Sequence, residues 1–186
     1  MSHSVDYLKE VCAIAHALPV RDVERLAMEL LELRARPGRL FFVGLGGSLA
    51  TAHHAVNDFR KLCGIEAYAP QAAELTARAN DEGWRTAFVN PFMKKGDALF
   101  VLSVGGGTAQ VSLPITCAIE AALMEKARVL GIVGRSGGYA KKYGHCVVVV
   151  PNAEPARVTP HTEGWQSVIL HLLVSHPKLQ TKATKW

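Results

Sequence analysis

Two side chains with metal-binding chemistry stand four residues apart in the first third of the chain. His54 and Asp58 lie in the segment LATAHHAVNDFR, and on a helix this spacing puts them on one face. An imidazole together with a carboxylate suits a zinc ion. The alternative is an ordinary helix that happens to carry two adjacent histidines. His53 and Asn57 point to other faces, and we expect them at the surface or behind the pair.

Three glycine-rich turns offer a second kind of chemistry. GLGGS follows the apolar run at residues 40–43, SVGGGT follows residues 98–103, and GRSGG follows residues 128–133. Glycine lets backbone amides approach an anion closely, and a helix that starts there adds its dipole. Structural turns alone would also need glycine, so this pattern leaves both readings open.

The first two turns carry the donors that a phosphate group needs. Gly46 and Gly47 supply backbone amides, and Ser48, Ser103 and Thr108 can add hydroxyl groups. These turns do not match a nucleotide signature. A Walker A loop requires GxxxxGK[ST], and the dinucleotide fingerprint requires glycine at position 49, where leucine stands. We therefore expect a monophosphate site and no nucleotide cofactor.

The elements that must position these groups alternate between short apolar runs and helical patterns. This order predicts an α/β protein, a three-layer α/β/α sandwich with a five-stranded parallel sheet, in which ligands sit beyond the carboxyl ends of the strands. An N-terminal helical hairpin precedes the sheet. We expect helices at 5–18, 22–34, 48–62, 71–78, 109–126 and 162–175, and strands at 40–43, 65–69, 98–103, 128–133 and 146–150, with an ambiguous stretch at 84–93, a loop at 151–160 and a short helix ending at residue 143.

Length and composition limit the remaining possibilities. The chain has 186 residues, 49% hydrophobic and 20% charged residues, and a net charge of +5. It predicts one domain: N-terminal helices at 1–37, an α/β core at 38–176 and a frayed tail at 177–186. The basic residues are spread out, which argues against nucleic acid as a partner. Four scattered cysteines, no secretory signal and no apolar run of about 20 residues favour a cytoplasmic protein away from membranes.

The segments GRLFFVGLGGSLATAHHAVNDF, LFVLSVGGGT and TPHTEGWQSVILHLLVSH resemble the SIS (sugar isomerase) domain family, and within it the bacterial phosphoheptose isomerases. The resemblance covers most of the chain. It implies a phosphosugar aldose–ketose isomerase that works as a homo-oligomer, a tetramer or dimer, with active sites near subunit interfaces. It implies that Ser48, Ser103 and Thr108 hold the phosphate, and Asp81 matches a position near the substrate. An Asx turn would explain Asp81 equally well.

The resemblance also implies a zinc site, one ion per subunit. Its ligands fall on His54, Asp58, Glu163 and His171, with Asp58 and His171 as the catalytic acid–base pair. Glu163 and His171 are eight residues apart, which on a regular helix means a rotation of about 80° and a rise of about 12 Å. The two can share one ion only if Glu163 lies at an irregular helix start. His161 is either a further ligand or proton shuttle, or a loop histidine in water.

This chain departs from the family pattern at several site positions. The family glutamate is replaced by Asp58 and the family glutamine by Glu163. Leu45 replaces an asparagine. The hydroxyl-rich loop after the third strand keeps only Ser103 and Thr108. These changes concern substrate identity and leave open a second function, a non-catalytic phosphosugar-binding or protein-interaction module.

Overall fold

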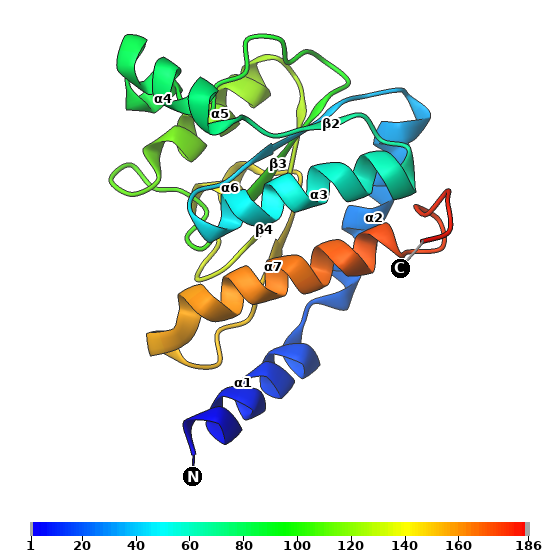
Figure 1. Cartoon of the computed structure of the whole chain (residues 1–186), viewed down its shortest axis with the longest axis vertical. Helices are drawn as coiled ribbons and strands as arrows, with labels where there is room; N and C mark the ends of the chain where they lie inside the picture. The colour runs from blue at the N-terminus through cyan, green and yellow to red at the C-terminus, as the bar shows by residue number, and fades with distance from the viewer. Residues whose placement is uncertain (1, 185–186) are drawn as a thin grey trace.

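The structure, a computed structural model, describes residues 2–184. The chain begins with two helices and then alternates strands and helices around one sheet (Figure 1). The elements in chain order are α1 (His3–Ala17), α2 (Val20–Ala35), β1 (Leu40–Val43), α3 (Gly47–Cys63), β2 (Ala67–Tyr68), α4 (Ala72–Asp81), η1 (Trp84–Thr86), β3 (Ala98–Ser103), α5 (Leu113–Met124), β4 (Arg128–Val133), α6 (Gly138–Tyr143), β5 (Cys146–Val149), η2 (Pro155–Arg157) and α7 (Val158–Val174).

The five strands form one parallel sheet in the order β2-β1-β3-β4-β5. β1 and β3 are buried along their whole length, as expected for strands that are covered on both faces. The chain reverses its direction of travel across the sheet between β2 and β3, so β1 and β3 are neighbours. The predicted five-stranded parallel α/β sheet is confirmed.

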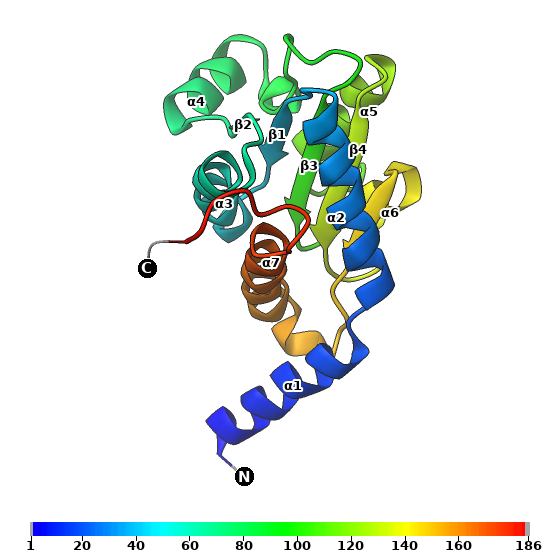
Figure 2. The same ribbon diagram turned by 90° about the vertical axis from the view of Figure 1, so that its right-hand side faces the viewer.

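Helices cover both faces of the sheet, which gives three layers (Figures 1 and 2). α2, α3 and α7 pack on one face around a core that includes Phe42, Phe59 and Phe100. α5 and α6 pack on the other face with Val101, Ile119 and other apolar residues. Both cores are made of aliphatic and aromatic residues at strand and helix spacing, so burial of these stripes holds the layers together.

The two N-terminal helices differ in their attachment. α2 lies against the sheet and buries five side chains, whereas α1 buries only Ile14 and points away from the body (Figure 2). α1 is held at its middle by Glu10, which pairs with Arg157 at 2.5 Å and with His161 at 2.7 Å. Tyr7 stacks on the His161 ring with centroids 4.4 Å apart. The first helix therefore contacts the start of α7.

The starts of α5 and α7 differ most from the sequence-based prediction, each by four residues. α5 starts at Leu113, four residues later than expected, because 108–112 form a turn in which Thr108 Oγ1 accepts a hydrogen bond from the Val111 amide at 2.9 Å. Pro114 therefore sits in the first turn, where its missing N–H costs nothing, and no kink is needed. α7 starts at Val158, earlier than expected, with Pro160 in its first turn for the same reason.

Residues 176–182, which follow α7, pack against the body, which corrects the prediction of a frayed tail for this part; residues 185 and 186 of the predicted tail lie outside the described residues. Leu179 is fully buried. Arg34 donates to the carbonyl oxygens of Lys178, Leu179 and Cys63. Thr181 donates to the Leu62 carbonyl through its hydroxyl at 3.0 Å and its amide at 2.7 Å. These contacts with α2 and α3 could not be predicted from the polar composition of the segment.

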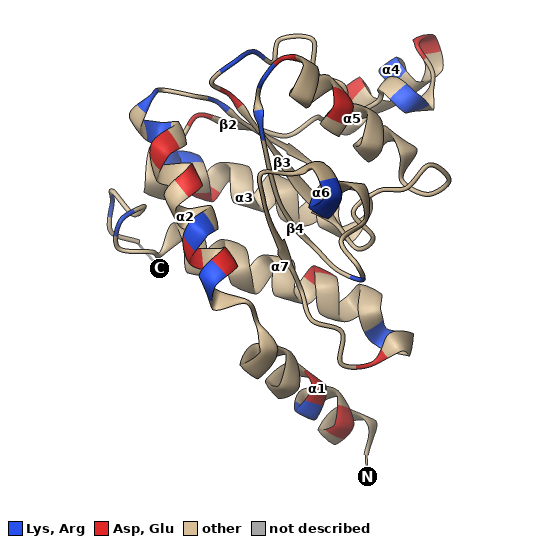
Figure 3. Cartoon of the chain, turned by 180° about the vertical axis from the view of Figure 1, so that it is seen from behind, with Lys and Arg blue, Asp and Glu red and all other residues tan. Residues whose placement is uncertain are grey.

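Charged residues of both signs alternate along α1 and α2 on the face seen in Figure 3, and α6 carries Lys141 and Lys142. This distribution agrees with a mixed surface. Among residues 2–184, no helix has the length and hydrophobicity that crossing a membrane requires.

Candidate active site

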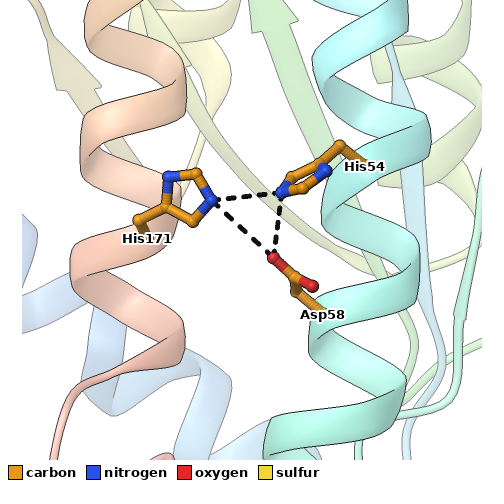
Figure 4. A group of neighbouring side chains, drawn as sticks. All are labelled: His54, Asp58 and His171. Atoms are coloured by element: carbon orange, nitrogen blue, oxygen red, sulfur yellow. Dashed lines mark hydrogen bonds and ion pairs between the residues drawn. The ribbon is translucent and has the colours of Figure 1, made fainter. Parts of the chain in front are cut away.

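Three side chains from two helices converge at the surface (Figure 4). The Nε2 atoms of His54 and His171 lie 3.1 Å apart, and Asp58 Oδ2 lies 3.1 Å from the first and 3.8 Å from the second. We call these three residues the His–Asp–His cluster. The Asp58 side chain is 10% exposed, whereas the His54 and His171 side chains are 58% and 48% exposed. Asn57 donates to Asp58 Oδ1 at 3.3 Å, which leaves Oδ2 facing the histidines.

The cluster fits a zinc ion by its donor set and by its spacing. Two imidazole nitrogens and one carboxylate oxygen are a common protein ligand set for zinc with one position open. With bonds of about 2.0–2.1 Å, ligand atoms of a tetrahedral zinc lie about 3.3 Å apart. All the potential ligand atoms of the cluster lie within 4.8 Å of one another. The predicted His54–Asp58 pair and His171 are therefore brought together as the spacing and the resemblance imply.

α3 and α7 form the cluster because they lie side by side and run in the same direction (Figure 1). Near the start of both helices, Ser48 Oγ donates to Gln166 Oε1 at 2.9 Å, and the cluster joins them further along. The buried face of α3 includes the small residues Ala52 and Ala55. α3 ends at Gly64, a left-handed residue whose amide donates to the Phe59 carbonyl.

Glu163, the fourth ligand that the resemblance implies, lies outside the cluster. α7 is a continuous helix from Val158, so Glu163 sits well before His171 along the helix axis and not at an irregular start. Its carboxylate instead lies against the start of α3, where a Cβ on Gly47 would be 2.5 Å from Glu163 Oε2. Within residues 2–184, this carboxylate has no hydrogen bond or ion pair.

A second region lies at the carboxyl ends of β1, β3 and β4, where a cavity of about 420 Å³ opens. We call it the strand-end pocket. Its polar lining includes the three hydroxyl residues that the sequence predicts for a phosphate. The lining residues are Leu45, Ser48, Ser103, Val104, Gly105, Gly107, Thr108, Val111, Ser112, Arg135, Ser136, Gly138 and Thr159.

The pocket wall is built by two interlocked glycine loops, 104–108 and 134–138. The amides of Tyr139 and Ala140 donate to the carbonyls of Gly107 and Gly106, each at 2.9 Å. Gly106 has φ +71°, and a Cβ there would collide with the Gly137 carbonyl. Only glycine allows this backbone approach, so these glycines serve loop packing as well as access to the pocket.

The three predicted hydroxyl groups are already partly engaged. Ser48 donates its hydroxyl proton to Gln166, and Thr108 Oγ1 lies 3.3 Å from the Val111 carbonyl as well as accepting from the Val111 amide. Ser103 Oγ accepts from the Gly106 amide at 3.1 Å. Ser103 is the hydroxyl whose proton remains available to a ligand. Two of the three predicted hydroxyl groups are thus already used within the protein.

The other predicted residues lie at the margins of the pocket or away from it. Gly46 (φ +58°) and Gly47 make the turn into α3, but they are not lining residues. Asp81 is the last residue of α4, is exposed, and accepts from Asn80 Nδ2 at 2.8 Å. It lines neither the pocket nor the cluster.

The sequence reading missed four residues that line the pocket and one that supports it. Ser112, Arg135, Ser136 and Thr159 line the pocket. Gln166 is fully buried and links Ser48 to the Ile132 carbonyl on β4. Arg135 and Ser136 belong to the third glycine-rich turn, GRSGG, and its position after a strand could have indicated that they line the pocket.

His161 has neither of the roles considered from sequence. It is 4% exposed within α7, where its ring lies between Tyr7 and the Glu10 carboxylate of α1. The Arg157 guanidinium, followed by the His161 ring, lowers the pKa of Glu10 to about 2. His161 thus belongs to the contact that anchors α1.

A further cavity of about 320 Å³ lies between α4 and the β1–β2 edge. Its arginines are paired. Arg39 binds Asp97 at 2.6 Å, and Arg78 donates to the Val89 carbonyl. Burial raises the pKa of Asp97, but hydrogen bonds from Arg39 and from backbone amides outweigh it and hold the pKa below its ordinary value. This cavity is therefore less suited to an anion than the strand-end pocket.

Comparison with known proteins supports the resemblance seen in the sequence. No family model matches the chain. It is 28% identical over 148 residues to the phosphoheptose isomerase of Mycobacterium tuberculosis, covering 74% of this chain and 71% of that protein. Its fold is similar to that of a phosphoheptose isomerase from Francisella tularensis, with a TM-score of 0.77, 20% identity and coverage of 94% and 97%.

A regulatory protein shares the fold as well. The sugar isomerase domain of an RpiR transcription factor from Sphaerobacter thermophilus superposes with a TM-score of 0.59, 14% identity and coverage of 92% of this chain and 84% of that one. The three-layer SIS fold and the likeness to phosphoheptose isomerases are thereby confirmed.

Proposed function

We propose that this chain is an isomerase that interconverts an aldose phosphate and a ketose phosphate. The observation that carries the proposal is the arrangement along α3. Ser48 in its first turn borders the strand-end pocket, and His54 and Asp58 follow on the same helix. At 1.5 Å per residue, the Cα atom of His54 lies about 9 Å along the axis from that of Ser48. One extended sugar phosphate would reach from the pocket towards the cluster. The phosphoheptose isomerase relatives support this reading.

In this proposal the strand-end pocket anchors the phosphate and so fixes the position of the sugar. Ser103 offers a free hydroxyl proton, and Ser48 and Thr108 add acceptor and donor capacity at the rim. Binding energy from this remote group is then available to orient the reacting carbons.

Asp58 and His171 act as the acid–base pair. One group removes a proton from the carbon beside the carbonyl while the other gives a proton to the carbonyl oxygen, which forms an enediol. The reverse transfers at the neighbouring carbon and oxygen complete the reaction without net gain of protons or electrons. Asp58 is mostly buried and its Oδ2 faces His171, so the two groups can act on adjacent atoms.

A zinc ion held by the His–Asp–His cluster would stabilise the negative charge that develops on the carbonyl oxygen. An aspartate that binds zinc tightly is a poor base, so the two roles of Asp58 compete. We also propose a homo-oligomer, a dimer or tetramer, which light scattering of the purified protein tests.

The decisive experiment uses Asp58→Asn. The purified protein is incubated with a panel of ketose and aldose phosphates, including sedoheptulose 7-phosphate, and NMR follows isomer formation. We expect turnover in the wild type and a loss of about a thousandfold or more in the variant, with phosphosugar binding retained. Asp22→Asn removes a carboxylate on α2 and serves as the control. Unchanged turnover in Asp58→Asn would contradict the proposed mechanism.

A non-catalytic phosphosugar sensor is the second candidate. The engagement of Ser48 and Thr108 within the protein and the RpiR domain with the same fold favour it. Metal analysis separates the two candidates. Stoichiometric zinc that is lost in His54→Ala supports the enzyme, whereas a metal-free protein that binds sugar phosphates without converting them supports the sensor.

A further inference from the structure

Among the described residues that line the strand-end pocket, one has a charged side chain. This residue is Arg135, in the loop between β4 and α6. Within residues 2–184, its guanidinium forms no hydrogen bond, ion pair or ring contact. An arginine fork without a partner at the edge of a hydroxyl-lined cavity is suited to an anion with several oxygens.

The backbone at Arg135 is held in an unusual conformation. Its φ is +51°, in the left-handed region that residues other than glycine rarely adopt. Four described non-glycine residues have positive φ, and two of them, Ser112 and Arg135, line this pocket. Residues in such conformations tend to gather at functional sites, where the surrounding structure maintains them.

The interlocked loops fix where the Arg135 side chain lies. The loop that carries Arg135 packs on the backbone of 105–107 through Gly137 and Gly138. A Cβ placed on Gly105 would be 3.9 Å from Arg135 Cδ, so the side chain runs past Gly105 and leaves room for a small substituent there. Arg135 therefore lies beside Gly105, a part of the loop after β3 that has no hydroxyl group.

We propose that Arg135 binds the phosphate group and determines the preference of this pocket for a phosphate monoester dianion. The inference rests on the proposed function, because it assigns a phosphate-binding residue to the same pocket. Ser48 and Thr108 are engaged within the protein, and the hydroxyl groups of the other lining residues carry no charge, so none of them offsets the charge of a phosphate dianion. A guanidinium supplies several donors in a fixed fork together with the positive charge.

The test is a calorimetric or ³¹P NMR titration with inorganic phosphate at low ionic strength. Arg135→Gly removes the guanidinium and relieves the positive φ, so it should fold at least as stably as the wild type. We expect phosphate to bind about tenfold or more weakly, because a hydrogen bond to a charged group is lost. Arg135→Lys should keep most of the affinity.

Lys126→Gly is the matched control. Lys126 also has a positive φ, +57°, and lies in the turn between α5 and β4, outside the pocket. The substitution removes the same charge and the same backbone strain, and phosphate affinity should stay within about twofold.

A second variant tests whether Arg135 replaces a hydroxyl. Adding Gly105→Ser to Arg135→Gly should restore part of the lost affinity. Equal phosphate affinity of Arg135→Gly and the wild type overturns the role of Arg135 but leaves the proposed isomerase intact. Isomerase activity has its own readout, so loss of turnover with normal phosphate binding counts against the proposed function alone. A wild type that binds no phosphate overturns both.

Discussion

The wall of the strand-end pocket is formed by two glycine loops that are joined through their backbones, whereas the His–Asp–His cluster is made of three side chains on two helices. Two glycine loops interlock to form the pocket wall, and the amides of Tyr139 and Ala140 tie them together. The cluster depends on the parallel alignment of α3 and α7, and its two histidines are about half exposed. The pocket is therefore expected to be rigid and sensitive to a Cβ added where the two loops touch, at Gly106 or Gly138, while the cluster should tolerate substitution with little effect on folding.

The largest expected effect comes from Gly106→Ala. The new methyl group would collide with the Gly137 carbonyl, and φ +71° would add strain, so we expect a loss of about 3 kcal/mol in unfolding free energy. Phosphate binding should be lost as well, while zinc binding by the folded fraction persists. Denaturant unfolding and titrations with phosphate and zinc measure these effects.

Gly83→Ala is the control for this substitution. Gly83 has φ +91° with open space around its Cβ position, so it should lose only about 1–2 kcal/mol from backbone strain. Equal losses of unfolding free energy in the two variants would mean that the contact between the two glycine loops adds no stability beyond that of an ordinary glycine turn.

His54→Ala should have the next largest effect, confined to the cluster. Removal of one ligand should weaken zinc binding by about a hundredfold or more, since even the loss of an indirect partner costs 10–100-fold. Because the side chain is 58% exposed, the unfolding free energy should change by no more than about 0.5 kcal/mol. A competition titration with a chelator measures the affinity. His53→Ala, on another face of α3, should bind zinc as the wild type does.

Glu163→Gln tests whether the two regions are separate. The Glu163 carboxylate lies against the start of α3, so its removal should raise phosphate affinity about two- to fivefold by taking away a negative charge near the pocket. Zinc affinity should remain unchanged, because Glu163 lies outside the cluster. A change in zinc affinity beyond about threefold would instead assign Glu163 to the metal site, as the family resemblance implies. Glu154→Gln removes a carboxylate from the N-cap of η2 as a control.

The smallest expected effect concerns α7, the helix that both regions share. The start of α7 is held by Glu10, whose pKa is lowered from 4.5 to about 2 by Arg157 and then His161. Since the folded-state pKa lies below the unfolded value, this contact stabilises the fold above about pH 4.5, and the contribution is lost as the pH falls towards 2. In Glu10→Gln, the denaturant midpoint of unfolding should change less between about pH 4.5 and pH 2 than it does in the wild type. An identical acid profile in the wild type and the variant would argue against the anchor.

Much of the fold and half of the site could be predicted from the sequence. Strands β1, β3 and β4 were predicted with their observed bounds because each is a short apolar run followed by a glycine turn. The predicted start of α5 was too early because the turn closed by Thr108 was not recognised, and the predicted start of α7 was too late because Pro160 was assigned to a loop and not to the first helical turn. The packing of Leu179 could not be predicted, since its partners lie in α2 and α3.

The sequence alone determined the order of the elements, the glycine turns at the strand ends and the shared face of His54 and Asp58. These features follow from local spacing, because the geometry of a turn or a helix repeats over a few residues. Only the tertiary structure decided that His171 joins that pair while Glu163 does not, and that Arg135 stands in the pocket. These outcomes depend on how α7 aligns with α3, more than a hundred residues earlier in the chain, and on how two loops pack together. Such contacts are set by the burial of whole faces, which no local pattern records.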